Sequence, residues 1–157
     1  MALDPSFVGR SYPTAGTYQV AREKIREFAE AIGDDNTVYR DPGVARGFGY
    51  PDVIAPPTFA IILVLRAQQA LISDPDLGLD YSRMVHGDQS FTHHRPIRAG
   101  DELATTVHVD GVRAMGGNDL LTVRCEITDH VGDPVTTARS LLVVRGPDEN
   151  PDEDRDR

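Results

Sequence analysis

The spacing of apolar residues changes along the chain from a helical period to a strand period. In the first part, Ile25, Phe28, Ala29 and Ile32 stand at positions i, i+3, i+4 and i+7, which predicts an amphipathic helix. Gly33 comes directly after them, and glycine is typical of a helix C-terminus. This region therefore predicts one helix with an apolar stripe, ending at Gly33.

A second apolar segment, Thr58 to Ile72, follows an irregular stretch from Asp34 to Pro57 that is rich in glycine and proline. Its first two turns are apolar on every side, which predicts a helix buried in the core. A helix that crosses a bilayer needs about 20 apolar residues, and this run is broken at Arg66. We therefore expect a core helix and not a membrane span.

From Met84 onward, apolar and polar residues alternate, which predicts half-buried strands. The clearest case is Leu121 to Thr128. Turn-forming residues at 98–101, 116–119 and 132–134 separate four such segments, and short turns between consecutive strands predict an antiparallel meander. The expected strands are Met84 to Arg95, Leu103 to Val112, Leu121 to Thr128 and Val135 to Val144, with a further strand suggested near Gly16 to Val20.

Helices that precede an antiparallel sheet predict an α+β fold in which a curved sheet wraps around the buried helix. One sheet of this size cannot cover such a helix completely and leaves edge strands open, so we expect the fold to close by dimerisation. We expect a single domain over residues 1–145. Residues 146–157 contain six acidic residues and two arginines and predict a disordered acidic tail.

The formal net charge of −9 argues against binding to nucleic acid or an anionic membrane, which would need a concentrated basic face. Cys125 is the only cysteine, so an internal disulfide and a cysteine-based zinc site are excluded. His93 and His94 are neighbours on a strand and point to opposite faces, so no metal is expected. The first twenty residues lack the apolar stretch of a signal peptide, and we expect a cytoplasmic protein.

Two segments carry a resemblance to a known family. The run Val85 to Asp101, which reads VHGDQSFTHHRPIRAGD, and the run Ile54 to Phe59, which reads IAPPTF, resemble the MaoC-like dehydratases. More narrowly, they resemble the fatty-acid-synthase-I-like dehydratase region and the A/C-type, non-catalytic subunit of bacterial heterodimeric (R)-3-hydroxyacyl-ACP dehydratases. The resemblance covers roughly Ser6 to Arg145 and implies a hot-dog fold, reversible loss of water from a 3-hydroxyacyl thioester, and no cofactor.

The catalytic motif that this family implies is Asp-x-Asn-Pro-x-His, and the corresponding stretch of this chain matches it only in part. Asp34 and Asn36 stand at the motif's Asp and Asn, whereas Thr37 replaces the proline and Tyr39 replaces the histidine. A phenol with a pKa near 10 is about 0.1% ionised at pH 7. The replacement therefore removes the base that the family implies.

The second departure concerns the donor that polarises the thioester carbonyl. In catalytic members this donor is a glycine amide at the start of the central helix, and the resemblance places Pro57 on that glycine. Proline has no amide hydrogen. Losing one such donor costs about 10²- to 10³-fold in rate, and losing a positioned acid or base costs about 10²- to 10⁴-fold. We therefore expect this chain alone to be inactive or weak.

The leading hypothesis is a subunit that holds the acyl chain of an acyl-ACP or acyl-CoA while a partner hot-dog subunit supplies the catalytic Asp and His. Arg95 and Arg98 are candidates for the carrier phosphate. The candidate substrate-binding residues are Phe48, Ile54, Pro57, Thr58, Phe59, Ile62, Leu63 and Gln89.

Three alternatives remain open. The chain could be a self-sufficient homodimeric hydratase or dehydratase that uses Asp34 with His86, or a non-enzymatic module that binds acyl thioesters. A hot-dog thioesterase ranks last, because it would need a carboxylate on the central helix and residues 58–72 contain no Asp or Glu.

Overall fold

The computed structural model describes residues 3–146 of the 157-residue chain. Its helices are α1 (Arg22–Ala31), α2 (Pro42–Gly47) and α3 (Ile61–Ile72). Its strands are β1 (Ser11–Pro13), β2 (Tyr18–Gln19), β3 (Met84–His93), β4 (Glu102–Met115), β5 (Asn118–Thr128) and β6 (Pro134–Val144). Short 3-10 turns lie at Pro5–Phe7, Thr37–Tyr39, Pro75–Leu77 and Tyr81–Arg83.

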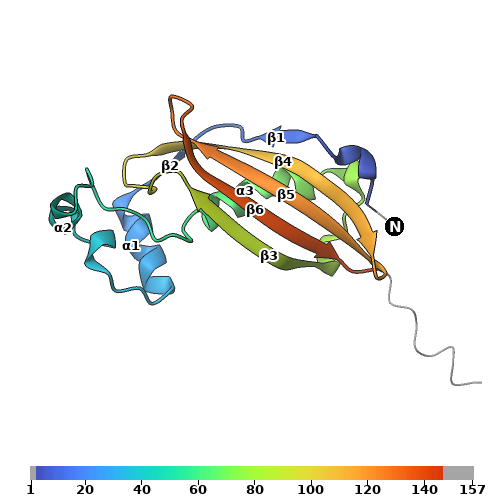
Figure 1. The fold of residues 1–157 in the computed structure, drawn as a ribbon, viewed down its shortest axis with the longest axis horizontal. Coiled ribbons are helices and arrows are strands. Elements are labelled where there is room, and N and C mark those ends of the chain that lie inside the picture. The colour runs from blue at the N-terminus through green and yellow to red at the C-terminus, as the bar shows by residue number, and fades with distance from the viewer. Residues whose placement is uncertain (1–2, 147–157) are drawn as a thin grey trace, which may run out of the picture.

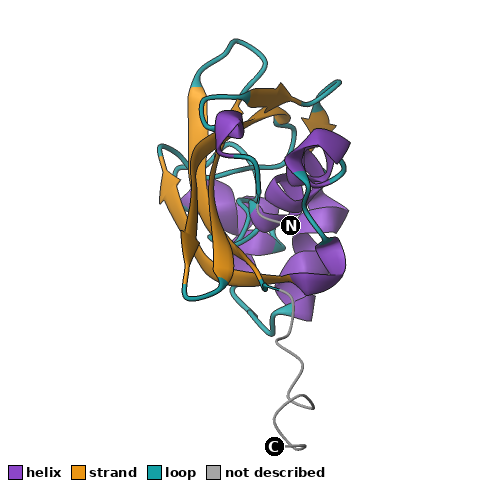
Figure 2. Ribbon diagram, turned by 90° about the vertical axis from the view of Figure 1, so that its right-hand side faces the viewer, coloured by secondary structure: helices purple, strands orange, loops and turns teal. Residues whose placement is uncertain are grey.

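The strands form one antiparallel sheet in the order β1-β4-β5-β6-β3, with β2 also paired to β4. In Figure 1 the strands lie in front of α3, and Figure 2 shows the helices gathered on one side of the sheet. This is the predicted α+β, hot-dog arrangement. The four main predicted strands are confirmed, with ends that shift by at most three residues.

The predicted meander is wrong for β3. Strands β4, β5 and β6 follow one another as neighbours, but β3 pairs with β6 at the far edge of the sheet. The turn residues at 98–101 therefore end a crossing connection and do not form a hairpin. Ile54 forms an isolated bridge with Arg98, so this connection runs beside the segment that enters α3. Strand β1 was not predicted because it has only three residues.

Helix α1 begins and ends close to its predicted bounds. Ile25 and Ala29 are fully buried, and Gly33 has a φ of 71°, which favours glycine because it has no Cβ. Ile32 differs from the prediction, since 48% of it is exposed. It lies one residue beyond the helix and lines a cavity. The apolar stripe therefore packs into the core at Ile25 and Ala29 but borders a cavity at Ile32.

Helix α3 is buried on one side only. Val64, Ala67 and Leu71 are almost fully buried and pack in the cluster that contains the inner residues of β4, β5 and β6. On the other side Leu65 is 53% exposed and Arg66 is exposed. The expectation that one sheet cannot cover this helix completely agrees with that open side.

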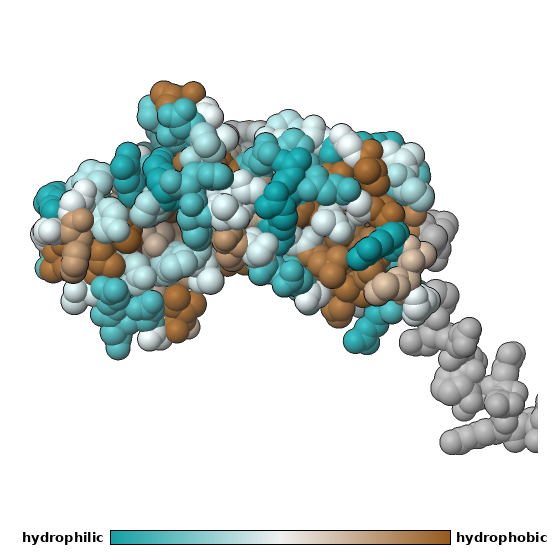
Figure 3. Space-filling view, viewed as in Figure 1, coloured by the Kyte–Doolittle hydropathy of each residue, from teal (hydrophilic) through white to brown (hydrophobic). Residues whose placement is uncertain are grey.

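None of the helices in residues 3–146 combines the length and apolar character needed to cross a bilayer. The outer face of the sheet, turned to the viewer in Figure 3, is mostly hydrophilic or neutral, with apolar patches at one end and at the tip of the β5–β6 turn. That turn carries Val131, which is 68% exposed. The predicted acidic tail lies outside the described residues, apart from its first residue, Gly146.

Two phenylalanines that were both expected to line the substrate site have opposite environments. Phe59 is fully buried, whereas 72% of Phe48 is exposed. We expect Phe59→Ala to lower the free energy of unfolding by about 3 to 5 kcal/mol, because it leaves a cavity in the core. The matched control Phe48→Ala should change it by less than about 0.5 kcal/mol. Chemical denaturation measures both, and equal effects would contradict this assignment of the core.

Candidate functional site

The two segments that carry the family resemblance meet at a hollow between the entry to α3 and the end of β3. We call it the Tyr39 cavity; its volume is about 320 Å³. Tyr39 contributes one wall, the segment before α3 a second, and the chain after β3 a third. Its lining residues are Tyr39, Ile54, Ala55, Pro56, Pro57, His93, His94, Arg95, Pro96 and Ile97.

A second and larger hollow, with a volume of about 760 Å³, adjoins the first and is called the His86 cavity. The two cavities share Pro57 and His93 in their walls. The wall of the His86 cavity is apolar where α1 and α3 contribute and mixed where β3 contributes. Its lining residues are Phe28, Ile32, Pro57, Thr58, Ile61, His86, Gln89, Ser90, Phe91 and His93.

Tyr39 has an environment that keeps its phenol protonated. It is only 8% exposed, and burial, with a further contribution from the negative charge of Asp34, raises the pKa of Tyr39 above its usual value. The structure therefore brings Asp34 close to Tyr39, as the motif requires of its Asp and His. The pair contains a phenol that stays neutral at neutral pH, and it contains no imidazole.

The side chains of Asp34 and Asn36 form local hydrogen bonds. The Asp34 carboxylate accepts from the backbone N–H of Asn36 at 3.1 Å, and the Asn36 side chain accepts from the N–H of Val38 at 3.1 Å. These contacts hold the turn that carries Tyr39 into the core. Neither side chain is among those that line the two cavities.

Pro57 stands where the chain turns into α3, and it contributes no hydrogen-bond donor to either cavity. The N–H of Phe59 donates to the carbonyl of Pro56 at 2.9 Å and so closes the turn before the helix. The backbone hydrogen that the family implies at this position is missing, because the residue is proline.

Two histidines on β3, His86 and His93, and a third directly after it, His94, all have hydrogen-bond partners. The His86 Nε2 atom lies 3.1 Å from Gln89 Oε1, the His93 Nδ1 atom 3.0 Å from Thr136 Oγ1, and the His94 Nε2 atom 3.1 Å from Thr137 Oγ1. His93 is the only one of them in both cavities. The sequence singled out His86 alone; the signal for His93 was its even spacing from Gln89 and Phe91 on one face of β3.

The candidate substrate-binding residues are not gathered in one place. Ile54 and Pro57 line the Tyr39 cavity, and Thr58 and Gln89 line the His86 cavity. Phe59 instead packs inside the core with its ring edge-on to Phe28, at 5.4 Å between ring centroids and 74° between planes. The remaining three are dispersed: Ile62 is half-buried against the core, Leu63 is 3% exposed, and Phe48 points to solvent.

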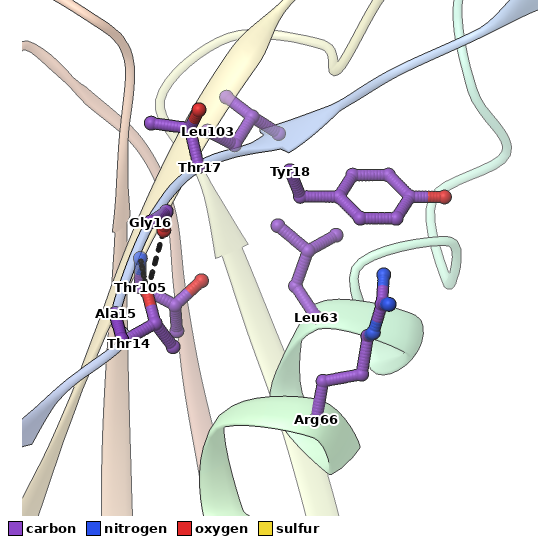
Figure 4. A pocket seen from close by; sticks show the side chains of 9 residues that line it. All are labelled: Thr14, Ala15, Gly16, Thr17, Tyr18, Leu63, Arg66, Leu103 and Thr105. Atoms are coloured by element: carbon purple, nitrogen blue, oxygen red, sulfur yellow. Dashed lines mark hydrogen bonds between the residues drawn. The ribbon is translucent and has the colours of Figure 1, made fainter.

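Leu63 lines a third cavity of about 220 Å³ between α3 and the β1–β2 edge of the sheet. Figure 4 shows Arg66 extending from α3 toward the ring of Tyr18, and the guanidinium carbon lies 5.2 Å from the ring centroid. Thr14 closes the opposite wall, where its hydroxyl donates to the carbonyl of Gly16 and accepts from the N–H of Thr105. Sequence reasoning missed this cavity, because nothing in the spacing of these residues links them.

The candidate carrier-binding arginines are engaged with acidic residues. Arg95 donates two hydrogen bonds to the Asp101 carboxylate, at 2.8 and 3.0 Å, and lies 3.5 Å from Asp129. Arg98 donates its backbone N–H to Asp101 at 3.0 Å, and its guanidinium lies 3.6 Å from the same carboxylate. Asp101 is buried, and an unpaired buried carboxylate would be strongly destabilising, so the two arginines compensate its negative charge. Arg98 is the more exposed of the two arginines and keeps more of its donors free.

A helix held in the curve of an antiparallel sheet, with these segments at its start, defines the hot-dog class of proteins. Within that class, residues 6–138 match the family model described as FAS1-like, dehydratase domain region. The chain belongs to this family. The predicted resemblance to MaoC-like dehydratases is thereby confirmed, while the narrower assignment to the A/C-type subunit stays a prediction.

The chain is similar over almost its whole length to the UPF0336 protein of Saccharopolyspora erythraea, with 61% identity over 152 residues that cover 97% of each chain. Among solved structures it resembles a MaoC-like dehydratase with a TM-score of 0.84 and 33% identity, covering 91% of this chain but only 43% of that longer one. It also resembles the C-terminally truncated HadBC (3R-hydroxyacyl-ACP dehydratase) complex of Mycobacterium tuberculosis, with a TM-score of 0.82, 29% identity and coverage of 91% and 99%.

The environment of Tyr39 generates a titration test. Because burial is the larger cause of its raised pKa and Asp34 the smaller, Asp34→Asn should lower the pKa of Tyr39 but leave it above its usual value of about 10. The phenolate absorbance of wild type, Asp34→Asn and Tyr39→Phe as a function of pH measures this.

The control for that titration is Asp35→Asn, since the Asp35 side chain is 98% exposed; it should leave the curve unchanged. The raised pKa also means that the folded state holds the phenol proton more tightly than the unfolded chain does. The resulting stability is present below about pH 10 and is lost as pH rises through the folded pKa. A Tyr39 that ionises at or below 10 would contradict the described burial.

Proposed function

We propose that this chain is a substrate-holding subunit of a cytoplasmic (R)-3-hydroxyacyl-thioester dehydratase of fatty acid biosynthesis, acting on an acyl-ACP or acyl-CoA. The observation that carries the proposal is the pair Tyr39 and Pro57, which line one cavity at the positions where the family implies a catalytic histidine and an amide donor. The catalytic Asp and His then come from a partner hot-dog subunit.

The missing groups are those that the reaction needs most. Dehydration requires a polarised thioester carbonyl, a base for the C2 proton and an acid for the leaving hydroxyl. A buried neutral phenol and a proline ring supply neither the base nor the donor. If each loss costs about 10²-fold or more, the chain alone would be slower than a complete site by about 10⁴-fold or more.

The His86 cavity supports a role in holding the acyl chain. Phe28, Ile61 and Phe91 give it apolar walls, and each methylene that leaves water for such a wall contributes about 0.8 kcal/mol. An acyl chain in this hollow would begin at the Tyr39 cavity, because Pro57 and His93 belong to both. Arg98, at the end of the crossing connection, remains the better of the two candidates for the carrier phosphate.

The partner role is supported by two open features of the chain. Strand β3 pairs only with β6 among residues 3–146, so one edge of β3 has free backbone groups. Helix α3 also has an open side with Leu65 half exposed. The similar HadBC structure is described as a complex, and a second hot-dog subunit or a second copy of this chain would cover both features.

The alternative is a self-sufficient homodimeric hydratase that uses Asp34 and His86. The observation that favours it is that His86 lines the larger cavity. Against it, the Asp34 carboxylate caps its own turn and is not in the cavity wall. A non-enzymatic module that binds acyl thioesters uses the same cavities without any catalytic step.

One assay separates these functions: hydration of a trans-2-enoyl-CoA by the purified chain, alone and with a catalytic MaoC-like subunit. We expect little turnover by this chain alone. On long-chain substrates, the two subunits together should turn over at least 10²-fold faster than the partner alone. Turnover by the chain alone that Asp34→Asn or His86→Ala abolishes would support the self-sufficient enzyme instead. Saturable binding with no turnover in either assay would support the binding module.

The partner interface has its own test. Leu65→Glu places a charge on the open side of α3 and should dissociate the dimer or heterodimer, because burying an unpaired carboxylate costs several kcal/mol. Val131→Asp is the matched control, since Val131 is also exposed but lies in the β5–β6 turn. Native mass measurement reports the assembly, and an unchanged mass for Leu65→Glu would exclude this face as the interface.

A further inference from the structure

A chain of hydrogen bonds crosses the sheet from α3 to the edge strand and ends at His86. Gln68 on α3 is 1% exposed and donates its side-chain N–H to the Ser140 hydroxyl at 3.0 Å. Ser140 on β6 is 2% exposed and donates in turn to Gln89 Oε1 at 2.6 Å. The same Gln89 oxygen lies 3.1 Å from His86 Nε2.

The direction of each bond in this chain is fixed by chemistry. Gln89 Nε2 donates to the carbonyl of Ser90 at 3.2 Å, and a carbonyl can only accept, so the amide oxygen is the atom that faces Ser140 and His86. Since an amide oxygen also only accepts, His86 Nε2 must carry its hydrogen. In the neutral ring, Nδ1 of His86 is then a lone-pair acceptor.

A β-bulge puts His86 on the face of β3 where this chain ends. His86 pairs with Leu142 and Asp88 with Leu141, so Gly87 is an extra residue without a partner. Leu142 is buried on the inner face of the sheet, and therefore His86 shares the inner face with Gln89, Phe91 and His93. If Gly87 were instead part of the regular alternation, with no bulge, His86 would lie on the opposite face from Gln89.

A side chain at the bulge would be crowded. A Cβ at position 87 would lie 3.0 Å from Val143 Cγ2 and 3.3 Å from the carbonyl oxygen of Leu141, which is closer than side chains normally approach. At Gly87 the backbone of β3 thus packs closely against β6, and the alternation of the β3 side chains shifts by one residue at the same point.

We infer that Gln68, Ser140 and Gln89 are positioning residues that hold neutral His86 in its Nε2–H form, so that Nδ1 accepts a hydrogen bond from a hydroxyl group of the ligand in the His86 cavity. This inference rests on the proposed function and names the group that the cavity recognises: the hydroxyl of the 3-hydroxyacyl chain, beside apolar walls formed by Phe28, Ile61 and Phe91. His86 holds that hydroxyl and does not protonate it.

The ring tautomer of His86 is measured by ¹⁵N NMR of the full chain, at a pH where imidazoles are neutral. We expect the wild type to be almost entirely Nε2–H, and the share of the Nδ1–H form to rise about 3- to 10-fold in Gln89→Leu, the value of one neutral hydrogen bond. Gln89→Glu keeps an acceptor and should restore the wild-type tautomer. Thr137→Val, which removes the partner of His94, is the control and should leave His86 unchanged.

Ligand recognition is measured by comparing a 3-hydroxyacyl-CoA with the acyl-CoA of the same length. The wild type should bind the hydroxylated thioester about 3- to 10-fold more tightly, and this preference should disappear in His86→Leu and weaken in Gln89→Leu. Equal affinities in the wild type, or a predominant Nδ1–H form, would overturn this inference and leave the proposed function standing. If neither thioester binds, with or without the catalytic partner, both fall.

Discussion

The fold depends on removing an apolar helix from water with a sheet that is too small to surround it. Helix α3 buries Val64, Ala67 and Leu71 against the inner face of the sheet, and burial of the valine and leucine side chains stabilises the fold by about 1.5 to 3 kcal/mol each. The order of the strands places β3 at the opposite edge from β1, so the sheet curves around one side of the helix. What it leaves open is the side on which the cavities and the expected partner lie.

This arrangement also determines where chemistry can occur. The start of α3 is where the buried helix, the turn with Tyr39 and the end of β3 come together. A proline there sets the direction of the chain but offers no hydrogen, and a buried phenol replaces a titratable ring. Most polar groups of the His86 cavity come from β3, and Gln89 among them is supported from behind by buried polar residues of α3 and β6.

Much of the fold was predictable from sequence because it rests on periodicity. The alternation along β4, β5 and β6 and the apolar run of α3 gave those elements to within a few residues. The position of β3 was not predictable in this way, since turn residues at 98–101 resemble a hairpin whether or not the strands pair. That distinction depends on the distant contact of Ile54 with Arg98. For the site, residue types predicted that a base and a donor are missing at Tyr39 and Pro57, but did not predict that the arginines are paired with acids or that Phe59 belongs to the core.

The unpaired Gly87 gives β3 two phases of alternation, one on each side of a single residue. If Gly87 instead took a regular position opposite Leu142, every downstream side chain would stay in place, Met84 and His86 would turn to the outer face, and Val85 would turn inward. Loss of Gly87 would only remove the bulge and keep these side chains on their present faces. The bulge therefore absorbs one residue without changing the phase of the strand, whereas regular pairing of that residue would exchange the whole upstream half of the strand between interior and solvent. Comparison of homologous sequences should count residues across this position before it compares their identities.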